Sequence, residues 1–404
     1  MAKKLPGFVE LVILIAMLSS LAALAIDAML PAMSQIGQDL QLAHENDVQL
    51  IITVLFLGMA LGQLVFGPLS DSTGRKPMMY LGLVVFMIGS VLSMVAEDFF
   101  LMLLGRFLQG FGSAAPRSLT TAIVRDHYAG RQMARIMSFT FAVFILVPML
   151  APFMGQGILQ IADWRAIFGT FLILSAIVYI WFMFRMPETL SEEHRRPFSF
   201  SHTWNDLRDI ISMRSVALYT LITGLLFGAF LGYLSSIQQI LQLQYGLAER
   251  FPFYFALLAF GIGFAAVVNA KLVLRFGMHW LCHQAIRLLT VLAAFFLLGM
   301  FLNAEHPPLW MFMCYLVCTL FGMGILFGNL NALAMEPLGK MAGLGASVIG
   351  AISTFISVPL GALIGYFYNG TVLPLVLGFF VLGLISLVLM RFADAARRNE
   401  TISG

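Results

Sequence analysis

Four charged side chains lie deep inside long apolar stretches of this chain of 404 residues, and they are the first candidates for chemistry: Asp27, Arg106, Arg117 and Arg287. A charge at the centre of a membrane-spanning helix costs about 2.5–3.5 kcal/mol on insertion scales, so such residues mark proton, ion or substrate pathways. Asp27 is the only acid among the four. A carboxyl removed from water can take up and release a proton as its surroundings change; the alternative is a structural carboxylate paired with an arginine.

Arg106 and Arg117 are expected on one face of a single helix. Eleven residues separate them, which corresponds to about 20° around a helix and ~16 Å along it. Gln109 and Ser113 lie between them and are candidates for a substrate cavity. The expected depth of Arg106 permits a pair with Asp27. Two interpretations of Arg117 stay open: a side chain that extends to the inner membrane surface, or a docking point for an anionic group of the substrate.

The second half of the chain contributes its own polar candidates for a cavity wall. Each is a polar side chain within an otherwise apolar run: Gln238, Gln239, His283, Arg287, Asn329 and Asn331. Glu336 lies at the inner end of its expected helix, so we expect a capping or gating salt bridge there rather than proton coupling.

The elements that must position these residues are membrane-spanning helices. Hydrophobic residues make up 60% of the chain and charged residues 11%, with a mean hydropathy of +0.92, which is too apolar for a soluble globular protein. A helix needs about 20 apolar residues to cross a bilayer. The apolar runs predict an all-α membrane protein with twelve spans, at residues 8–37, 47–67, 77–96, 99–124, 133–160, 164–186, 215–243, 251–275, 279–302, 308–335, 342–368 and 370–392.

The orientation follows from the basic residues. Of the 23 lysines and arginines, 18 fall on the side that holds both termini, two on the opposite side and three inside the membrane, so both termini are predicted to be cytoplasmic. The polar segment 187–214 separates two pseudo-symmetric bundles of six helices, at residues 1–186 and 215–404. Such an internal repeat predicts a substrate site between the halves, near the membrane midplane.

The connection between the second and third expected spans reads Gly67-Pro-Leu-Ser-Asp-Ser-Thr-Gly-Arg-Lys-Pro77. Gly67, Asp71, Gly74, Arg75 and Lys76 resemble the signature loop of the major facilitator superfamily at its characteristic spacing. The resemblance implies a cytoplasmic gating loop that latches the N-terminal half. It also implies the twelve-helix fold of that superfamily.

Two further stretches carry the resemblance. Arg106-Phe-Leu-Gln-Gly-Phe-Gly112 is similar to the motif of the fourth helix, in which the arginine is linked to proton transfer. Pro148, Pro152 and Gly155 resemble the antiporter motif of the fifth helix, where close packing restricts leak, although Ala151 and Gln156 replace two of its usual glycines.

With Asp27-Ala-Met-Leu-Pro31 and the boundary at Trp164-Arg165, these motifs resemble the bicyclomycin-resistance (Bcr/CflA) branch of drug:proton antiporters. The resemblance implies proton-coupled efflux of small molecules, drugs among them, across the inner membrane by alternating access. Asp27 and Arg106 would then couple transport to protons, and the partners would be substrate, protons and lipid, with the chain acting as a monomer.

Two alternatives stay open. Three arginines against one acid inside the membrane favour an exporter of a specific endogenous anion, such as a carboxylate siderophore. A receptor that transports nothing, or a membrane enzyme, is more distant, because the sequence has no nucleotide loop, metal cluster or nucleophile–base set. We therefore expect no enzymatic activity, no cofactor, no metal and no nucleic-acid partner.

Overall fold

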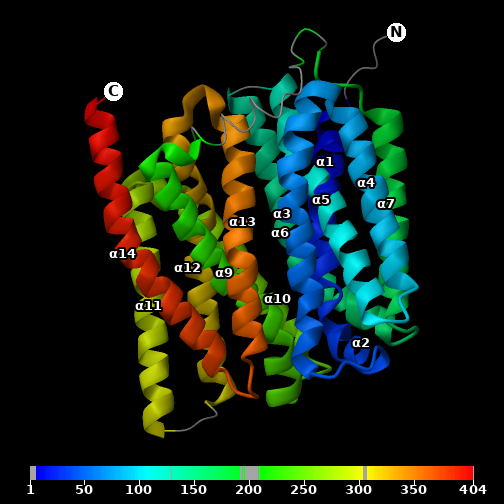
Figure 1. Cartoon of the computed structure of the whole chain (residues 1–404), viewed down its shortest axis with the longest axis vertical. Coiled ribbons are helices and arrows are strands. Elements are labelled where there is room, and N and C mark those ends of the chain that lie inside the picture. Colours follow the sequence, from blue (N-terminus) through cyan, green and yellow to red (C-terminus); the bar gives the residue numbers. More distant parts are fainter. Residues whose placement is uncertain are drawn as a thin grey trace. The chain divides into compact units, whose positions relative to one another are not determined.

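The computed structural model describes residues 6–128, 130–191, 193, 195, 208, 210–303 and 307–403, and within these ranges it is helical, without strands. The chain divides into two compact units, residues 1–203 and 204–404 (Figure 1). The described part contains twelve long helices, six in each unit, and this is the twelve-helix arrangement predicted from the apolar runs.

The first unit begins with a broken helix. Its elements are α1 (Phe8–Asp27), a 3-10 turn (Leu30–Ala32), α2 (Met33–Asp39), α3 (Leu50–Thr73), α4 (Arg75–Met94), α5 (Phe99–His127), α6 (Gly130–Leu159) and α7 (Arg165–Arg185). The predicted span over 8–37 is confirmed, since Phe8–Asp39 is long and apolar enough to form one membrane span, but its helix is interrupted after Asp27. The break has a local cause: Pro31 has no N–H to donate, and its ring clashes with the carbonyl four residues earlier, which belongs to Asp27. Asp27 is consequently the last residue of α1.

The second unit repeats this arrangement with different residues. Its elements are α9 (Arg214–Gln239), a π-helical turn (Ile240–Gln244), α10 (Phe251–Phe276), α11 (Met278–Asn303), α12 (Leu309–Met335), α13 (Ala342–Tyr366) and α14 (Leu373–Ser403). The pairs α1–α6, α1–α5, α1–α7, α3–α5, α4–α5 and α4–α7 pack together in unit 1. Their counterparts α9–α13, α9–α12, α9–α14, α10–α12, α11–α12 and α11–α14 pack together in unit 2.

The repeat extends to the backbone of one turn. Gly74 separates α3 from α4 with φ 107° and ψ 157°, and Gly277 separates α10 from α11 with φ 77° and ψ 160°. A positive φ of this kind favours glycine. The expected loop of eleven residues is thus a single glycine, because α3 continues through Gly67 and Pro68 to Thr73.

Glycine also explains how α5 is accommodated. Eleven of the described helical segments are long and apolar enough to cross a membrane by themselves, and α5 is not among them. It instead packs tightly against α3 and α4: a Cβ added at Gly110 would lie 1.9 Å from Leu55 O, and one at Gly89 of α4 would lie 2.4 Å from Gln109 N. These close approaches enclose the part of α5 that carries Arg106 and Gln109.

Candidate functional site

Arg106 is fully buried at the centre of this packing. Its guanidinium donates to Ala25 O on α1 through both terminal nitrogens at 3.1 Å, to Ile51 O on α3 at 3.2 Å and to Gln109 Oε1 at 2.5 Å. Gln109 in turn donates to Ser90 Oγ on α4 at 2.9 Å. The guanidinium therefore joins three helices through neutral acceptors.

Asp27 lies two residues beyond the carbonyl that Arg106 binds. Only 5% of its surface is exposed. Among the residues that the structure describes, its carboxyl has no hydrogen bond and no ion pair. The pair that the sequence permits between Asp27 and Arg106 is not formed here, because the N–H groups of the guanidinium are directed to backbone carbonyls and an amide. A buried carboxyl without a partner is costly when charged, so this position favours exchange of a proton.

The break that follows Asp27 packs against α6. A Cβ added at Gly155 would lie 1.8 Å from Ala28 O, so only glycine permits this approach of the two backbones. Gly155 belongs to the antiporter motif predicted for the fifth span, which is α6. It therefore brings the backbone of α6 into contact with the residue that follows Asp27. Pro148 and Pro152 lie within α6 on the approach to this contact.

Arg117 differs from Arg106 because it is exposed. Its guanidinium donates a weak hydrogen bond from Nη1 to Met59 Sδ on α3, at 3.9 Å. Gly58 of α3 contacts Phe107 of α5, and Gly62 contacts Phe111, so the two helices run in the same direction. Arg117 lies about six residues after Phe111, so its backbone is closer than Gly62 to the end of α3 at Gly74.

The side chain of Arg117 therefore reaches back toward the middle of α3, away from the end at Gly74. This direction is the natural one, since side chains on a helix lean toward its N-terminus. It does not fit a side chain that extends to the membrane surface at the Gly74 end.

Two polar residues of α5 are occupied internally. Gln109 bridges Arg106 and Ser90, and Ser113 donates to Gly110 O at 2.8 Å. Both are at most 1% exposed. In this structure they support α5, because glycines bring α3 and α4 onto this part of the helix. Their role in a substrate cavity stays a prediction.

The predicted gating loop is a hydrogen-bonded hub within unit 1. Arg75 donates to Asp71 Oδ1 at 2.5 Å, to Ser70 Oγ at 2.7 Å and, through Nε, to Asp126 Oδ2 on α5 at 3.2 Å. Lys76 donates from Nζ to the carbonyl of Met183 in the last turn of α7 at 3.2 Å and to that of Met186, directly after α7, at 2.6 Å. The turn therefore ties the ends of four helices together.

Glu188 completes this hub, and the sequence did not identify its role. Its carboxylate accepts the backbone N–H groups of Arg75 and Lys76 at 2.9 and 3.0 Å, which is the favourable place for a negative charge at the start of α4. A Cβ at Gly74 would meet Glu188 Oε2 at 2.5 Å. The available signal was Glu188's position three residues after the end of α7, but nothing local in the sequence connects it to a turn more than 110 residues earlier.

The corresponding end of unit 2 holds a second polar cluster. Asp394 on α14 accepts from Tyr219 at 2.9 Å and contacts His279 Nδ1 at 3.1 Å and His283 Nε2 at 2.6 Å. Arg397 contacts His279 as well, and it forms an ion pair with Glu336 at 3.1 Å. The expected salt bridge of Glu336 is therefore confirmed.

These contacts place His283 in the polar cluster of unit 2, and its role in a substrate cavity stays a prediction. The imidazole faces α14 because Asp394 offers it a charged acceptor. Arg287, one turn further along α11, is exposed on the same stripe as Val291 and Phe295, which are 49% and 69% exposed. That apolar stripe does not fit the wall of a polar cavity.

The other predicted cavity residues of unit 2 have internal partners. Asn329 and Asn269 exchange amide hydrogen bonds at 2.8 and 3.4 Å and so join α12 to α10. Asn331 is exposed, and its amide donates to Phe327 O at 2.9 Å. Gln238 and Gln239 are buried at the end of α9, where Gln238 donates to Gln242 at 2.5 Å.

Comparisons with known proteins agree with this fold. The sequence model of the Major Facilitator Superfamily matches residues 14–362. Similar proteins include an uncharacterised MFS-type transporter, YdgK, of Bacillus subtilis, 29% identical over 88% of each chain. They also include a bicyclomycin resistance protein homolog of Haemophilus influenzae, 27% identical over 90% of this chain and 91% of that one.

The multidrug resistance protein MdtL of Citrobacter koseri is 28% identical over 84% of this chain and 85% of its own. Among solved structures, the human organic anion transporter MFSD10 matches with a TM-score of 0.69 and 16% identity, over 95% of this chain and all of that one. At that identity the likeness shows the fold alone. The matched family model covers most of the chain, and the chain therefore belongs to the Major Facilitator Superfamily.

Proposed function

We propose that the protein exports small molecules, drugs among them, across the inner membrane in exchange for protons. The observation that carries the proposal is the buried carboxyl of Asp27, which has no hydrogen bond or ion pair among the described residues. The names of the relatives, a bicyclomycin resistance protein homolog and a multidrug resistance protein, support the substrate class.

In the proposed cycle, a proton from outside neutralises Asp27 and removes the cost of its buried charge. Neutral Asp27 favours one orientation of the transporter, and ionised Asp27 favours the other, so protonation and substrate release alternate. Arg106 holds α1 at Ala25 and so transmits a change at the end of α1 to α3 and α5.

The energy suffices for concentrative transport. A proton that moves inward releases about 2.3 kcal/mol per 100 mV, and tenfold accumulation requires about 1.4 kcal/mol. We further propose that both termini lie in the cytoplasm, because most of the 23 lysines and arginines fall on that side.

Proteoliposomes with an imposed pH gradient test the proposal. Asp27→Asn keeps the shape of the side chain but cannot exchange a proton, so uphill transport should fall to the level of protein-free liposomes while downhill exchange persists. Glu97→Gln is the matched control, because Glu97 is an exposed acid between α4 and α5, and it should transport normally. Uphill transport by Asp27→Asn would show that another group carries the proton.

A second candidate is export of an endogenous anion, and Arg117 favours it. An exposed guanidinium within a spanning helix, in contact with a thioether rather than a carboxylate, is available to an anionic group. The two candidates differ in substrate and share the proton-coupling step.

A further inference from the structure

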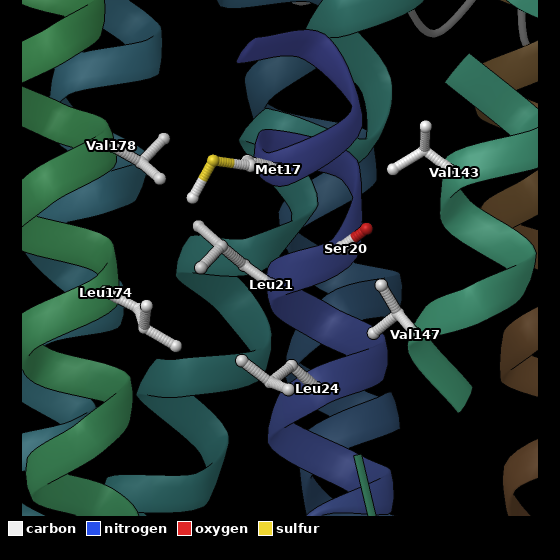
Figure 2. A pocket seen from close by; sticks show the side chains of 8 residues that line it. All are labelled: Met17, Ser20, Leu21, Leu24, Val143, Val147, Leu174 and Val178. Carbon is white, nitrogen blue, oxygen red and sulfur yellow. The ribbon is translucent and has the colours of Figure 1, made fainter. Parts of the chain in front are cut away.

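Unit 1 contains a pocket that none of the motifs involves. It has a volume of about 160 Å³ and lies between α1, α6 and α7. Figure 2 shows the lining, with α1 as the floor between the two other helices: Met17, Ser20, Leu21, Leu24, Val143, Val147, Leu174 and Val178. Seven of the eight side chains are apolar.

The one polar group of the pocket is the hydroxyl of Ser20. Ser20 is 7% exposed, and its Oγ has no hydrogen-bond partner within the part of the chain that the structure describes. Ser90 on α4 and Ser118 on α5 bond back to a carbonyl of the preceding turn, Phe86 O at 2.9 Å and Ala114 O at 2.8 Å. Ser93 on α4 and Thr140 on α6 share with Ser20 a buried hydroxyl without a partner among the described residues, but neither of them lines the pocket. Figure 2 shows the Ser20 hydroxyl directed from α1 toward the side of α6 that carries Val143 and Val147.

The rim of the pocket is continuous with apolar surface. On α7, Ile173 and Ile177 next to the lining residues are 63% and 49% exposed. On α6, Leu146 and Leu150 are 50% and 60% exposed. Exposed apolar residues on spanning helices are suited to hydrocarbon, so a molecule dissolved in the membrane can reach the pocket without crossing water.

We infer that this pocket binds a small lipophilic molecule that carries one hydrogen-bonding group, such as a hydroxyl or a carbonyl, taken up from the membrane. The apolar walls accept its hydrocarbon part, and Ser20 Oγ completes its otherwise missing hydrogen bond with the polar group. A lipid acyl chain would leave the Ser20 hydroxyl without a hydrogen bond, so we infer a ligand that carries one hydrogen-bonding group.

The pocket ends beside the proposed proton site. Its residues on α1 form a helical stripe that continues from Leu24 to Asp27 and Ala28, and its stripe on α6 continues from Val147 to Gly155. The close approach of Gly155 to Ala28 lies further along these two stripes, beyond the residues that line the pocket. An occupant would therefore lie one to two turns from Asp27, on the same face of α1, although its binding depends on no transport step.

Photolabelling tests the inference on the full-length protein in lipid nanodiscs. Two probes are used: a medium-chain alcohol with a diazirine on the chain, and the matching diazirine alkane without the hydroxyl. Labelled residues are identified by mass spectrometry over a range of probe concentrations. We expect the alcohol to label the pocket residues and to bind about two- to twelvefold more tightly than the alkane, the ratio that one hydrogen bond supplies.

Three variants decide the outcome. Ser20→Ala should reduce the alcohol to the affinity of the alkane. Leu174→Trp fills the pocket and should abolish labelling by both probes, whereas Ile173→Trp, at the neighbouring exposed position of α7, should not.

Equal labelling by the two probes in the unaltered protein would overturn the inference and show a site for lipid chains only. Labelling that survives Leu174→Trp would also overturn it. Because Asp27→Asn should leave labelling unchanged, failure of this site and failure of the proposed proton coupling are distinguishable.

Discussion

At the scale of single residues, the surroundings of Arg106 and Asp27, two buried charges of unit 1, differ in the hydrogen bonds that they offer. Arg106 is surrounded by two backbone carbonyls and an amide, so its charge is stabilised without a carboxylate. Asp27 receives no such support. An arginine stays protonated at any accessible pH, whereas a carboxyl can become neutral. The buried position without hydrogen-bond partners is therefore occupied by Asp27, the group that can lose its charge.

Arg117 gives the sharpest prediction at this scale. If an anionic substrate binds this guanidinium through two parallel hydrogen bonds, Arg117→Lys should weaken its transport about tenfold, and Arg117→Ala should weaken it further. Cationic and neutral substrates should be spared. Transport of a matched panel of anionic, neutral and cationic compounds in the same vesicles is the measurement, and a uniform loss across the panel would rule out an anion site.

At the scale of elements, the charged helix α5 depends on its neighbours for its place in the membrane. It is too polar to be among the apolar spans, and glycines let α3 and α4 approach its backbone. Small residues that permit close contact are the usual means of helix association in lipid, where the hydrophobic effect between helices is absent. The break between α1 and α2 is positioned in the same way, by Gly155 of α6.

Gly155 and Gly157 form a matched pair that tests this packing. A methyl group at Gly155 would lie 1.8 Å from Ala28 O, whereas nothing lies within 4 Å of one at Gly157. We expect Gly155→Ala to destabilise the protein by about 1–3 kcal/mol, the usual cost of overpacking, and to lower the Tm in detergent. Gly157→Ala should change stability by less than about 0.5 kcal/mol. Equal Tm values for the two variants would contradict the close contact.

At the scale of the whole molecule, two bundles of six helices use the same pairings and the same glycine turn, yet stabilise that turn differently. Unit 1 surrounds Gly74 with Arg75, Asp126 and Glu188. Unit 2 instead joins His279 and Asp394 near Gly277. The shared backbone geometry of the two glycine turns reflects the repeat, whereas the side chains that stabilise each turn differ between the units.

The gating loop should control the balance between the two orientations of the transporter. Arg75→Ala removes the buried guanidinium that joins α3 to α5, so we expect at least about a tenfold change in the ratio of the two orientations, with the intrinsic substrate affinity retained. Distances between spin labels placed one in each unit would measure that ratio. Arg125→Ala, an exposed position one residue before Asp126, is the control. An unchanged distance distribution in Arg75→Ala would argue against a latch.

The sequence by itself determined the twelve helices, the repeat and the family, because these follow from periodic apolar runs and from motifs contained within about a dozen residues. It also located Asp27 and Arg106 as buried charges, since a charge within an apolar run is visible without a structure. It placed the loop around Gly74 at a helix junction, although it did not foresee that α3 continues to Thr73.

Only the tertiary structure decided which polar groups are already occupied. Gln109 supports Arg106, His283 faces Asp394 and Asn329 pairs with Asn269, and the last two partners lie 111 and 60 residues away in the chain. Asp27, by contrast, has no partner among the described residues. A sequence gives the helical face on which a polar residue lies, but a hydrogen bond or an ion pair depends on atoms that distant helices bring within about 3 Å, and that distance exists only in the fold.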